Sequence, residues 1–412
     1  MMGEGSEGSE EMTNEEFIKQ HRNENPLSLA LKKAPEGIDL QWCLRQIEGY
    51  GIAKKKLPEW TKTDNIWFPP RLSMEQCSSE TTARYKQAIA ERLGCKVLID
   101  LTGGFGIDFS YMARNMENAF YIEQQEVLCN IASHNFPLMG LQNIKIYNTA
   151  CEEFWNQYVS DSTTAEKQRE KILIYLDPAR RNNKGEKVFS INDCTPDVTL
   201  LQDSLLENSA YIMLKLSPML DIAQARRQLK DISEIHIVSV KGECKELIFV
   251  MSKDSDRQHY YCVNLETDEA PFTSDTSATT EQAEIALPSE ITEGAFLFEP
   301  NASIMKAGVQ NAFARRYNLK KLHPMSNLFL GKEPIQNIPA RQFIIERMSD
   351  FQKGNLKSFM QDIRQANLTI RNFPSTVEDL KKRLKIKDGG NIYLFATTLS
   401  DDTHVLIRGG KR

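Results

Sequence analysis

The sequence lacks the features of a membrane protein, a secreted protein or a zinc-module protein. It has no run of about eighteen apolar residues and no apolar segment near residue 1, so we expect neither a membrane span nor a signal peptide. Its eight cysteines form no CxxC pair and their spacing fits no zinc module, so we predict no metal site. Isolated cysteines are typical of a reducing compartment, and we expect a cytoplasmic protein.

The charge and the length of the chain set two further limits. With 51 basic and 56 acidic residues the formal net charge is -5, so a nucleic-acid partner would need a local basic patch. A chain of 412 residues is too long for one hydrophobic core, so we expect two or three domains.

Composition and periodicity divide the chain into six segments. An acidic, glycine-containing start is typical of a disordered tail, and a polar, acidic stretch after the middle is typical of a linker. The predicted ranges are a disordered acidic tail at 1–15, a helical region at 16–94, a strand–helix domain at 95–265, an acidic linker at 266–294, a strand-and-helix segment at 295–338 and a small α+β module at 339–412.

Short apolar runs alternate with helical windows in the central domain, which predicts an α/β fold with a doubly wound parallel sheet. Strands are predicted at 97–101, 119–122, 144–147, 171–176, 210–216, 234–240 and 246–251. Only Lys241–Lys245 separates the last two strands, and so short a link cannot hold a crossover helix. We therefore expect the last pair to be antiparallel.

A glycine-rich turn after the first of these strands is the main functional signal. In Val97–Asp108 an apolar run is followed by an acid, glycines and a second acid, a pattern typical of a strand that enters a helix across a nucleotide-sized crevice. A dinucleotide would require a small residue in place of Phe109 and would be repelled by Asp108, whereas acids suit a cationic ligand such as S-adenosylmethionine. The candidate cofactor contacts here are Asp100, Thr102, Gly103, Gly104, Phe105, Gly106 and Asp108.

The ends of the next two strands supply further candidate cofactor contacts. Glu123 ends the second predicted strand, and an acid at this spacing after a glycine turn can accept hydrogen bonds from ribose hydroxyls. Backbone groups of Thr149 and Ala150 follow the third strand and could meet an adenine edge, while Asn148 could simply cap the next helix.

A second motif, Asp177-Pro178, ends the fourth strand at the edge where ligands of open α/β sheets bind. Both residues are predicted to be catalytic, because such a turn can accept hydrogen bonds from an amino group and methyl transfer needs mainly positioning. Arg180 and Arg181 could hold a substrate phosphate or pair with acids of the loop. Lys215 could face the substrate or mark the exit of the fifth strand to solvent.

Two other methyl-transfer chemistries have weaker support. A cysteine nucleophile for carbon-5 methylation should follow the fourth or fifth strand closely, and Cys194 lies well downstream of Asp177. Transfer to a ribose 2′-oxygen often uses lysines and a glutamate around an aspartate. Lys215, Asp177 and Glu246 could form such a set, although their spacing is not specific.

The two motifs, in this order, resemble motifs I and IV of class I S-adenosylmethionine-dependent methyltransferases, whose seven-stranded sheet also ends in an antiparallel hairpin. Leu72–Lys86, Leu297–Gly308 and Leu384–Gly390 are similar to a bacterial family with a helical region before the methyltransferase domain. In that family a ferredoxin-like segment, here 295–338, and a THUMP-like domain, here 339–412, follow. The resemblance covers nearly the whole chain from about residue 15.

The resemblance implies cofactor contact at Asp100, Gly104, Gly106 and Glu123, and acceptor contact near Asp177 and Pro178. One departure concerns the acceptor. The second motif continues with alanine and arginine, and lacks the aromatic ring that stacks on a flipped base in amino-methyltransferases.

The C-terminal module favours an RNA partner. THUMP domains in related enzymes bind structured RNA, and residues 341–412 hold fourteen Lys plus Arg against eight Asp plus Glu. Lys381, Lys382 and Arg383 are predicted to contact phosphates, although bases also favour the solvated end of a helix. We therefore predict a methyltransferase that acts on an rRNA or tRNA nucleotide. The alternatives are a catalytically silent, cofactor-binding RNA scaffold, a nicotinamide dehydrogenase, and a protein or small-molecule methyltransferase.

Overall fold

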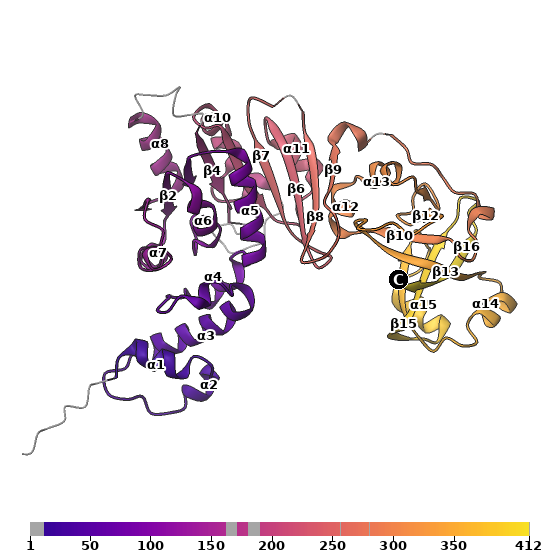
Figure 1. The fold of residues 1–412 in the computed structure, drawn as a ribbon, viewed down its shortest axis with the longest axis horizontal. Coiled ribbons are helices and arrows are strands. Elements are labelled where there is room, and N and C mark those ends of the chain that lie inside the picture. The colour runs from indigo at the N-terminus through magenta and orange to yellow at the C-terminus, as the bar shows by residue number, and fades with distance from the viewer. Residues whose placement is uncertain (1–11, 162–170, 180–189, 256, 280, 412) are drawn as a thin grey trace, which may run out of the picture. The chain divides into compact units, whose positions relative to one another are not determined.

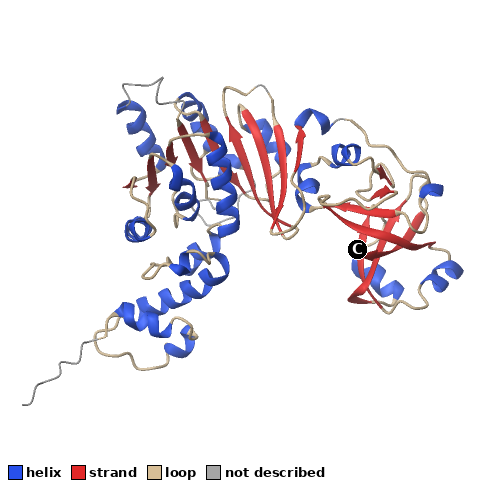
Figure 2. Cartoon of the chain, viewed as in Figure 1, coloured by secondary structure: helices blue, strands red, loops and turns tan. Residues whose placement is uncertain are grey.

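The computed structural model describes residues 12–161, 171–179, 190–255, 257–279 and 281–411 (Figures 1 and 2). The chain divides into two compact units. The first unit comprises Met1–Lys215, Ala223–Asp231 and Val250–Asp254. The second comprises Leu216–Ile222, Ile232–Phe249 and Ser255–Arg412. Within the described residues, no helix combines the length and the apolar character that crossing a bilayer requires.

Helices form the N-terminal part of the first unit, as the sequence predicts. They are α1 (Asn14–His21), α2 (Pro26–Leu29), α3 (Leu40–Lys56), η1 (Trp60–Lys62), α4 (Arg71–Gln76) and α5 (Glu80–Leu93). Ser79 caps α5, because its hydroxyl accepts a hydrogen bond from the N–H of Thr82 at 3.2 Å. Gly94 ends the helix with a φ of 71°. These caps fix the entry of the chain into the sheet that follows.

A parallel sheet forms the centre of the first unit. Its strands are β1 (Val97–Asp100), β2 (Asn118–Glu123), β3 (Ile144–Asn148), β4 (Ile172–Leu176) and β5 (Tyr211–Leu216), in the order β3-β2-β1-β4-β5. The helices between and after them are α6 (Ile107–Met112), η2 (Ala113–Asn115), α7 (Glu126–Leu138), α8 (Cys151–Asp161), η3 (Ile191–Asp193), α10 (Val198–Glu207) and α11 (Ile222–Gln228). Ile99 and Ile174 are fully buried, as expected for parallel strands covered on both faces.

The register brings acidic residues together at the carboxyl edge of this sheet. Asp100, the last residue of β1, pairs with Tyr121 of β2 on one side and with Tyr175 of β4 on the other. Glu123 and Asp177 each follow two residues after those tyrosines. Because parallel strands all end at the same edge, the two sequence motifs lie close together, as the predicted fold requires.

Four strands of the second unit, β6 (Ile232–Val240), β7 (Glu243–Met251), β8 (His259–Leu265) and β9 (Phe272–Asp275), lie in the order β7-β6-β8-β9. Lys241 and Gly242 join β6 to β7 and have φ values of 51° and 84°. A two-residue link with positive φ at both positions is an antiparallel hairpin turn. The predicted final hairpin therefore forms, with a link shorter than the five residues predicted.

The segment 266–294 is more ordered than the linker that its composition predicts. β9 lies within it and pairs antiparallel with β8, and the segment also holds η4 (Thr276–Thr279) and η5 (Pro288–Glu290). Phe272 of β9 is fully buried, with its ring centroid 6.0 Å from that of Phe313. One buried aromatic residue anchors a stretch whose other residues are mostly polar, which is why composition alone misjudges it.

The C-terminal part of the second unit is a seven-stranded sheet with helices. Its elements are β10 (Phe296–Pro300), α12 (Ala302–Ala307), α13 (Gln310–Arg316), β11 (Lys320–Lys321), β12 (Phe329–Gly331), β13 (Ala340–Asp350), α14 (Lys353–Phe359), β14 (Gln365–Arg371), α15 (Val377–Leu384), β15 (Lys387–Thr398) and β16 (His404–Lys411). The strand order is β11-β12-β10-β13-β16-β15-β14, with β14 and β15 parallel. Gly308, with a φ of 74°, separates α12 from α13.

Candidate active site

Two glycines of the turn between β1 and α6 are required by packing. The N–H of Gly103 donates to the carbonyl of Ile122 at 2.8 Å, which fixes the turn against β2. A β-carbon at Gly103 would lie 2.3 Å from the Tyr121 ring. One at Gly106, where φ is 83°, would lie 2.7 Å from the Phe136 ring. Any side chain at these positions would force the rings to move.

Gly104 differs from these two because it faces open space. A β-carbon added there would meet only the carbonyl oxygen of Thr102, at 3.8 Å. The φ of Gly104 is 56°, its N–H donates to the Glu123 carboxylate at 2.9 Å, and its carbonyl accepts from the Tyr121 hydroxyl. The backbone is thus held in place from one side and left uncovered on the other, as a closely approaching ligand requires.

Asp100 is a buried carboxyl without a cationic partner among the described residues. Its side chain accepts from the N–H of Thr102 at 2.9 Å and from the Thr102 hydroxyl at 3.5 Å. Burial raises the pKa of Asp100 well above its ordinary value, and the carboxylates of Asp108, Asp177 and Glu123 raise it further, while the Thr102 N–H opposes the shift. A nearby positive charge would stabilise the ionised form.

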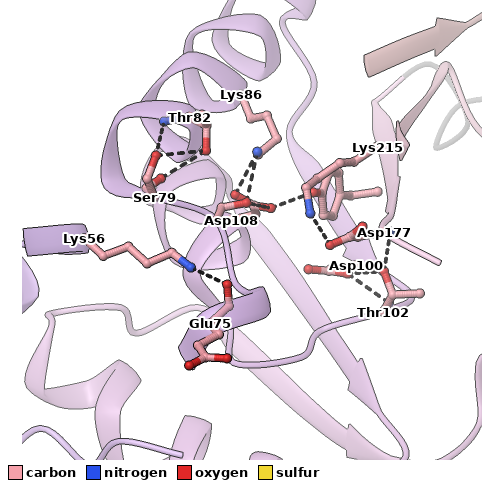
Figure 3. A network of polar contacts seen from close by, with 12 residues as sticks. Lys56, Glu75, Ser79, Thr82, Lys86, Asp100, Thr102, Asp108, Asp177 and Lys215 are labelled. Atoms are coloured by element: carbon pink, nitrogen blue, oxygen red, sulfur yellow. Dashed lines mark hydrogen bonds and ion pairs between the residues drawn. The ribbon is translucent and has the colours of Figure 1, made fainter. Parts of the chain in front are cut away.

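Asp108 lies in the first turn of α6 and already has partners within the protein (Figure 3). Its Oδ1 lies 3.1 Å from the ammonium of the buried Lys86, and its Oδ2 accepts from the hydroxyls of Ser78 at 2.8 Å and Tyr175 at 2.7 Å. Burial alone would raise the pKa of Asp108, but the ammonium groups of Lys86 and Lys215 and the two hydroxyls bring it below its ordinary value. Lys86 thus balances the charge of Asp108 within the protein. A contact between Asp108 and the cofactor stays a prediction.

Glu123 is held by backbone donors at the end of β2. Its Oε2 accepts from the N–H of Gly104, and its Oε1 accepts from the N–H of Gln125 at 2.8 Å. A carboxylate has about four lone-pair positions, so each oxygen can accept a further hydrogen bond. Both backbone contacts orient Glu123 beside the uncovered glycine, where the sequence predicts a ribose.

Asp177 is joined to the same group of residues through Thr102. Its N–H donates to the Thr102 hydroxyl at 2.6 Å, and its carboxylate forms an ion pair with the ammonium of Lys215 from β5 (Figure 3). Pro178 is buried directly after it. The structure thus brings the predicted acceptor residues next to the predicted cofactor residues, while Arg180 and Arg181 lie outside the described residues.

The two phenylalanines of this segment pack against other aromatic rings. The Phe105 ring lies 5.0 Å from that of Trp60 and 6.4 Å from that of Phe68, measured between centroids. Phe109 is fully buried beside Tyr121, at 5.4 Å. Phe105 can therefore offer a ligand its backbone but not its ring.

The predicted adenine contacts lie at the start of α8. The carbonyl of Ala150 accepts from the N–H of Phe154 at 3.1 Å, and the hydroxyl of Thr149 donates to Glu153 at 2.8 Å. Asn148 does not cap this helix with its side chain, because its amide donates to the carbonyls of Glu123 and Gln124, each at 3.0 Å. Asn148 instead ties the end of β3 to the end of β2.

The predicted basic cluster lies on α15 in the second unit. Lys381 forms an ion pair with Asp388 at 2.9 Å, and the Arg383 guanidinium lies 5.2 Å from the Phe351 ring centroid. Lys382 and Arg383 are exposed. Two of the three bases are therefore accessible to a partner.

Three partners of Asp108 escaped the sequence prediction: Lys86, Ser78 and Tyr175. A signal existed for Lys86, which shares the buried face of α5 with Thr82, Ala83, Ile89 and Ala90. A lysine in such a stripe requires a buried acid. Burial raises the pKa of Cys77 to about 11, so this residue is a thiol at neutral pH and a poor nucleophile.

Two domain families match the C-terminal part of the chain. A ferredoxin-like domain matches residues 296–339, and a THUMP domain-like family matches residues 340–411. The resemblance inferred from the sequence is confirmed for this part of the chain.

Over most of its length the chain is similar to proteins named as methyltransferases. The crystal structure of a putative methyltransferase from Porphyromonas gingivalis W83 has a TM-score of 0.81 and 28% identity, and the match covers 97% of each chain. Two Mycobacterium tuberculosis proteins, from strains CDC 1551 and H37Rv, are each named an uncharacterized S-adenosylmethionine-dependent methyltransferase. Each is 20% identical over 336 residues, which is 80% of this chain and 82% of its relative. The predicted fold class is confirmed.

Proposed function

We propose that this protein transfers the methyl group of S-adenosylmethionine to a nucleotide of RNA. The methyltransferase class rests on the full-length similarity to the Porphyromonas protein and on the mycobacterial relatives. The same mycobacterial relatives are named for their dependence on S-adenosylmethionine, which makes it the cofactor of this chain. The choice of RNA as the substrate rests on separate observations of the C-terminal part of the chain.

The observation that carries the cofactor assignment is the electrostatic state of Asp100. This buried carboxyl precedes the turn that holds the uncovered backbone of Gly104, and no described residue forms an ion pair with it. S-adenosylmethionine carries an ammonium and a sulfonium, and either would supply the missing positive charge. A dinucleotide would instead bring a pyrophosphate to the glycine turn after β1, near the buried Asp100, which has no described cation beside it. Glu123 favours neither ligand, because both contain a ribose.

The chain's own residues would bind and align the two reactants. The bound cofactor supplies an electrophilic methyl group on its sulfonium. Asp100 balances positive charge, Glu123 accepts from ribose hydroxyls, and Gly104 allows close approach. Asp177 and Pro178 position the acceptor, and alignment of this kind carries most of the rate in a transfer that needs little acid–base chemistry.

The C-terminal part of the second unit supports RNA as the substrate. Residues 340–411 match the THUMP domain-like family, and the resemblance implies binding of structured RNA by such domains. Lys382 and Arg383 of α15 are exposed and can meet phosphates, whereas Lys381 is already paired with Asp388. Arg180 and Arg181 follow the second motif directly in sequence and are further candidate phosphate contacts.

Titration calorimetry with S-adenosylmethionine tests the cofactor half. Asp100→Asn keeps an oxygen acceptor for the Thr102 N–H but removes the charge, so we expect at least a tenfold weaker Kd, about 1.4 kcal/mol. Glu123→Gln should weaken binding in the same direction. Asp203→Asn is the matched control, because Asp203 is an exposed acid paired with Lys230 at 2.8 Å. An unchanged Kd in the first two variants would refute the assignment.

Methyl incorporation tests the RNA half. The purified protein is incubated with labelled S-adenosylmethionine and with RNA from cells that lack this protein, and ribonuclease-sensitive label is expected. Cofactor binding without label in any RNA pool would favour a silent scaffold. Label that survives ribonuclease treatment of a lysate would favour a protein or small-molecule substrate.

A further inference from the structure

Lys215 and Asp177 stand in contact where the methyl acceptor is expected. The Thr102 hydroxyl links Asp177 to Asp100, because it lies 2.6 Å from the N–H of one and 3.5 Å from the carboxylate of the other (Figure 3). The ammonium of Lys215 contacts Oδ2 of Asp177, and its charge also acts on Asp108. A cationic donor and an anionic acceptor thus lie together beside the cofactor residues.

This Lys215–Asp177 pair fits poorly with an amino group as the acceptor. A neutral exocyclic amine has two N–H donors that need acceptors, whereas an ammonium offers only donors. One carboxylate oxygen of Asp177 is already engaged by Lys215. The residues after it are the buried Pro178 and then Ala179, and neither has an aromatic ring that could stack on a flipped base.

A hydroxyl acceptor needs the combination that this pair supplies. Its proton requires an acceptor, and its oxygen requires a donor as negative charge develops during attack. The Asp177 carboxylate and the Lys215 ammonium can fill these two roles. The Lys215 side chain is only 14% exposed, so its charge acts more strongly on a developing oxyanion than it would in bulk water.

We propose that the methyl acceptor is a ribose 2′-hydroxyl of RNA and that Lys215 and Asp177 are catalytic residues for this transfer, an inference that rests on the proposed function. The 2′-oxygen forms a bond to the methyl carbon while the carbon–sulfur bond breaks, and the electron pair of that bond stays on sulfur. The products are the 2′-O-methyl ribose and S-adenosylhomocysteine. The hydroxyl proton passes to the Asp177 carboxylate, whose side chain is 38% exposed and can release it to water.

Alkaline hydrolysis of the labelled RNA separates this proposal from the one on which it rests. A 2′-O-methyl group blocks cleavage of the adjacent phosphodiester, so label is expected in alkali-resistant dinucleotides. Label in mononucleotides with a methylated base would overturn the ribose assignment and leave the RNA methyltransferase standing. Absence of label from RNA would overturn both. A substrate with a 2′-deoxyribose at the methylated position should accept no label.

Variants of Lys215 test its role. Lys215→Met should lower kcat at least a hundredfold and leave the Kd of S-adenosylmethionine within about threefold of the wild type. Lys215→Arg keeps the charge and should retain part of the activity, and it gives the same test if the methionine variant does not fold. Lys230→Met removes a comparable lysine–aspartate pair with Asp203 and should not change kcat. Full activity in Lys215→Met would refute the assignment.

Discussion

The two acidic residues that flank the glycine turn have similar burial and opposite electrostatics. Asp100 is 1% exposed and Asp108 is 9% exposed. Asp108 has an ammonium at 3.1 Å, and its pKa lies below the ordinary value despite burial. Asp100 has only Thr102 as a described partner, and burial holds its pKa well above the ordinary value. Asp108 therefore stabilises the fold through its ion pair with Lys86. Asp100 remains available to pair with a positively charged ligand.

Removal of the Lys86 ammonium should cause the largest loss of stability among the variants of these residues. Lys86→Met leaves the Asp108 carboxylate buried and unpaired, and we expect a loss of about 3–5 kcal/mol in the free energy of unfolding. Urea denaturation followed by circular dichroism measures it. The double variant Lys86→Met/Asp108→Asn removes both charges and should recover much of the loss. If the double variant is no more stable than the single one, Lys86 does not act through Asp108.

Alanine at two neighbouring glycines should separate folding from binding. Gly103→Ala places a methyl group 2.3 Å from the Tyr121 ring and should cost about 3 kcal/mol of stability. Gly104→Ala meets no such obstacle, and its positive φ should cost only about 1 kcal/mol. The Gly104 variant should nevertheless weaken S-adenosylmethionine binding, as calorimetry can measure. Equal affinity in that variant and the wild type would mean that the ligand does not approach this carbon.

The hydroxyl of Tyr175, which donates a hydrogen bond to Asp108, should contribute less to stability than Lys86 does. Tyr175→Phe removes one hydrogen bond to the charged Asp108 and should cost about 1.5–2 kcal/mol, measured by thermal unfolding. Tyr158→Phe removes a hydroxyl elsewhere in the first unit and serves as a comparison. If Tyr175→Phe lost as much stability as Lys86→Met, hydrogen bonds rather than the ion pair would be the main stabilising contacts of Asp108.

The smallest effect is on the pH dependence of stability, where the two acids should act in opposite directions. An unfolded aspartate has a pKa of about 3.9. Since the folded pKa of Asp100 is raised, its stabilising contribution is present below about pH 4 and is lost as pH rises through the folded pKa. Since that of Asp108 is lowered, its contribution is present above about pH 4 and is lost as pH falls.

Asp100→Asn should therefore match the wild type at low pH and become the more stable protein as pH rises. Asp108→Asn should show the opposite trend and become less stable as pH rises, because Lys86 loses its partner. Thermal midpoints measured across the acidic and neutral range test both signs. A stability difference between Asp100→Asn and the wild type that shrinks as pH rises would contradict the assigned state of Asp100.

The sequence allowed most of the fold around the site to be predicted, because local patterns determine it. Apolar runs predicted β1 and β4 to within a residue, and the glycine turn and the second motif followed from chain order. The parallel register then required their ends to meet. By contrast, the state of Asp108 depends on Tyr175, which lies 67 residues along the chain, and on Lys86 of another element. The buried stripe of α5 indicates that Lys86 needs an acid, but no local pattern identifies Asp108 as that acid.

Other misjudged elements have an equally physical cause. The strands of the C-terminal module were not predicted one by one, and β14 illustrates why: its burial alternates imperfectly, and it pairs with β15 through a register shift between Ala366 and Asn367. The sequence pattern did not predict β9, because Phe272 is its one buried aromatic residue and its neighbours are polar. In each case the tertiary partner supplies the stabilisation that the local sequence lacks.

The contact between Asp108 and α5 has a consequence for anyone who would trim this protein to a minimal catalytic fragment. A fragment that starts at β1 would look complete on a topology diagram, yet it would discard the ammonium and the Ser78 hydroxyl that accompany the acid of α6. The helical N-terminal region is therefore part of the core of the first unit. Its removal would leave the carboxylate of Asp108 buried without its ion-pair partner.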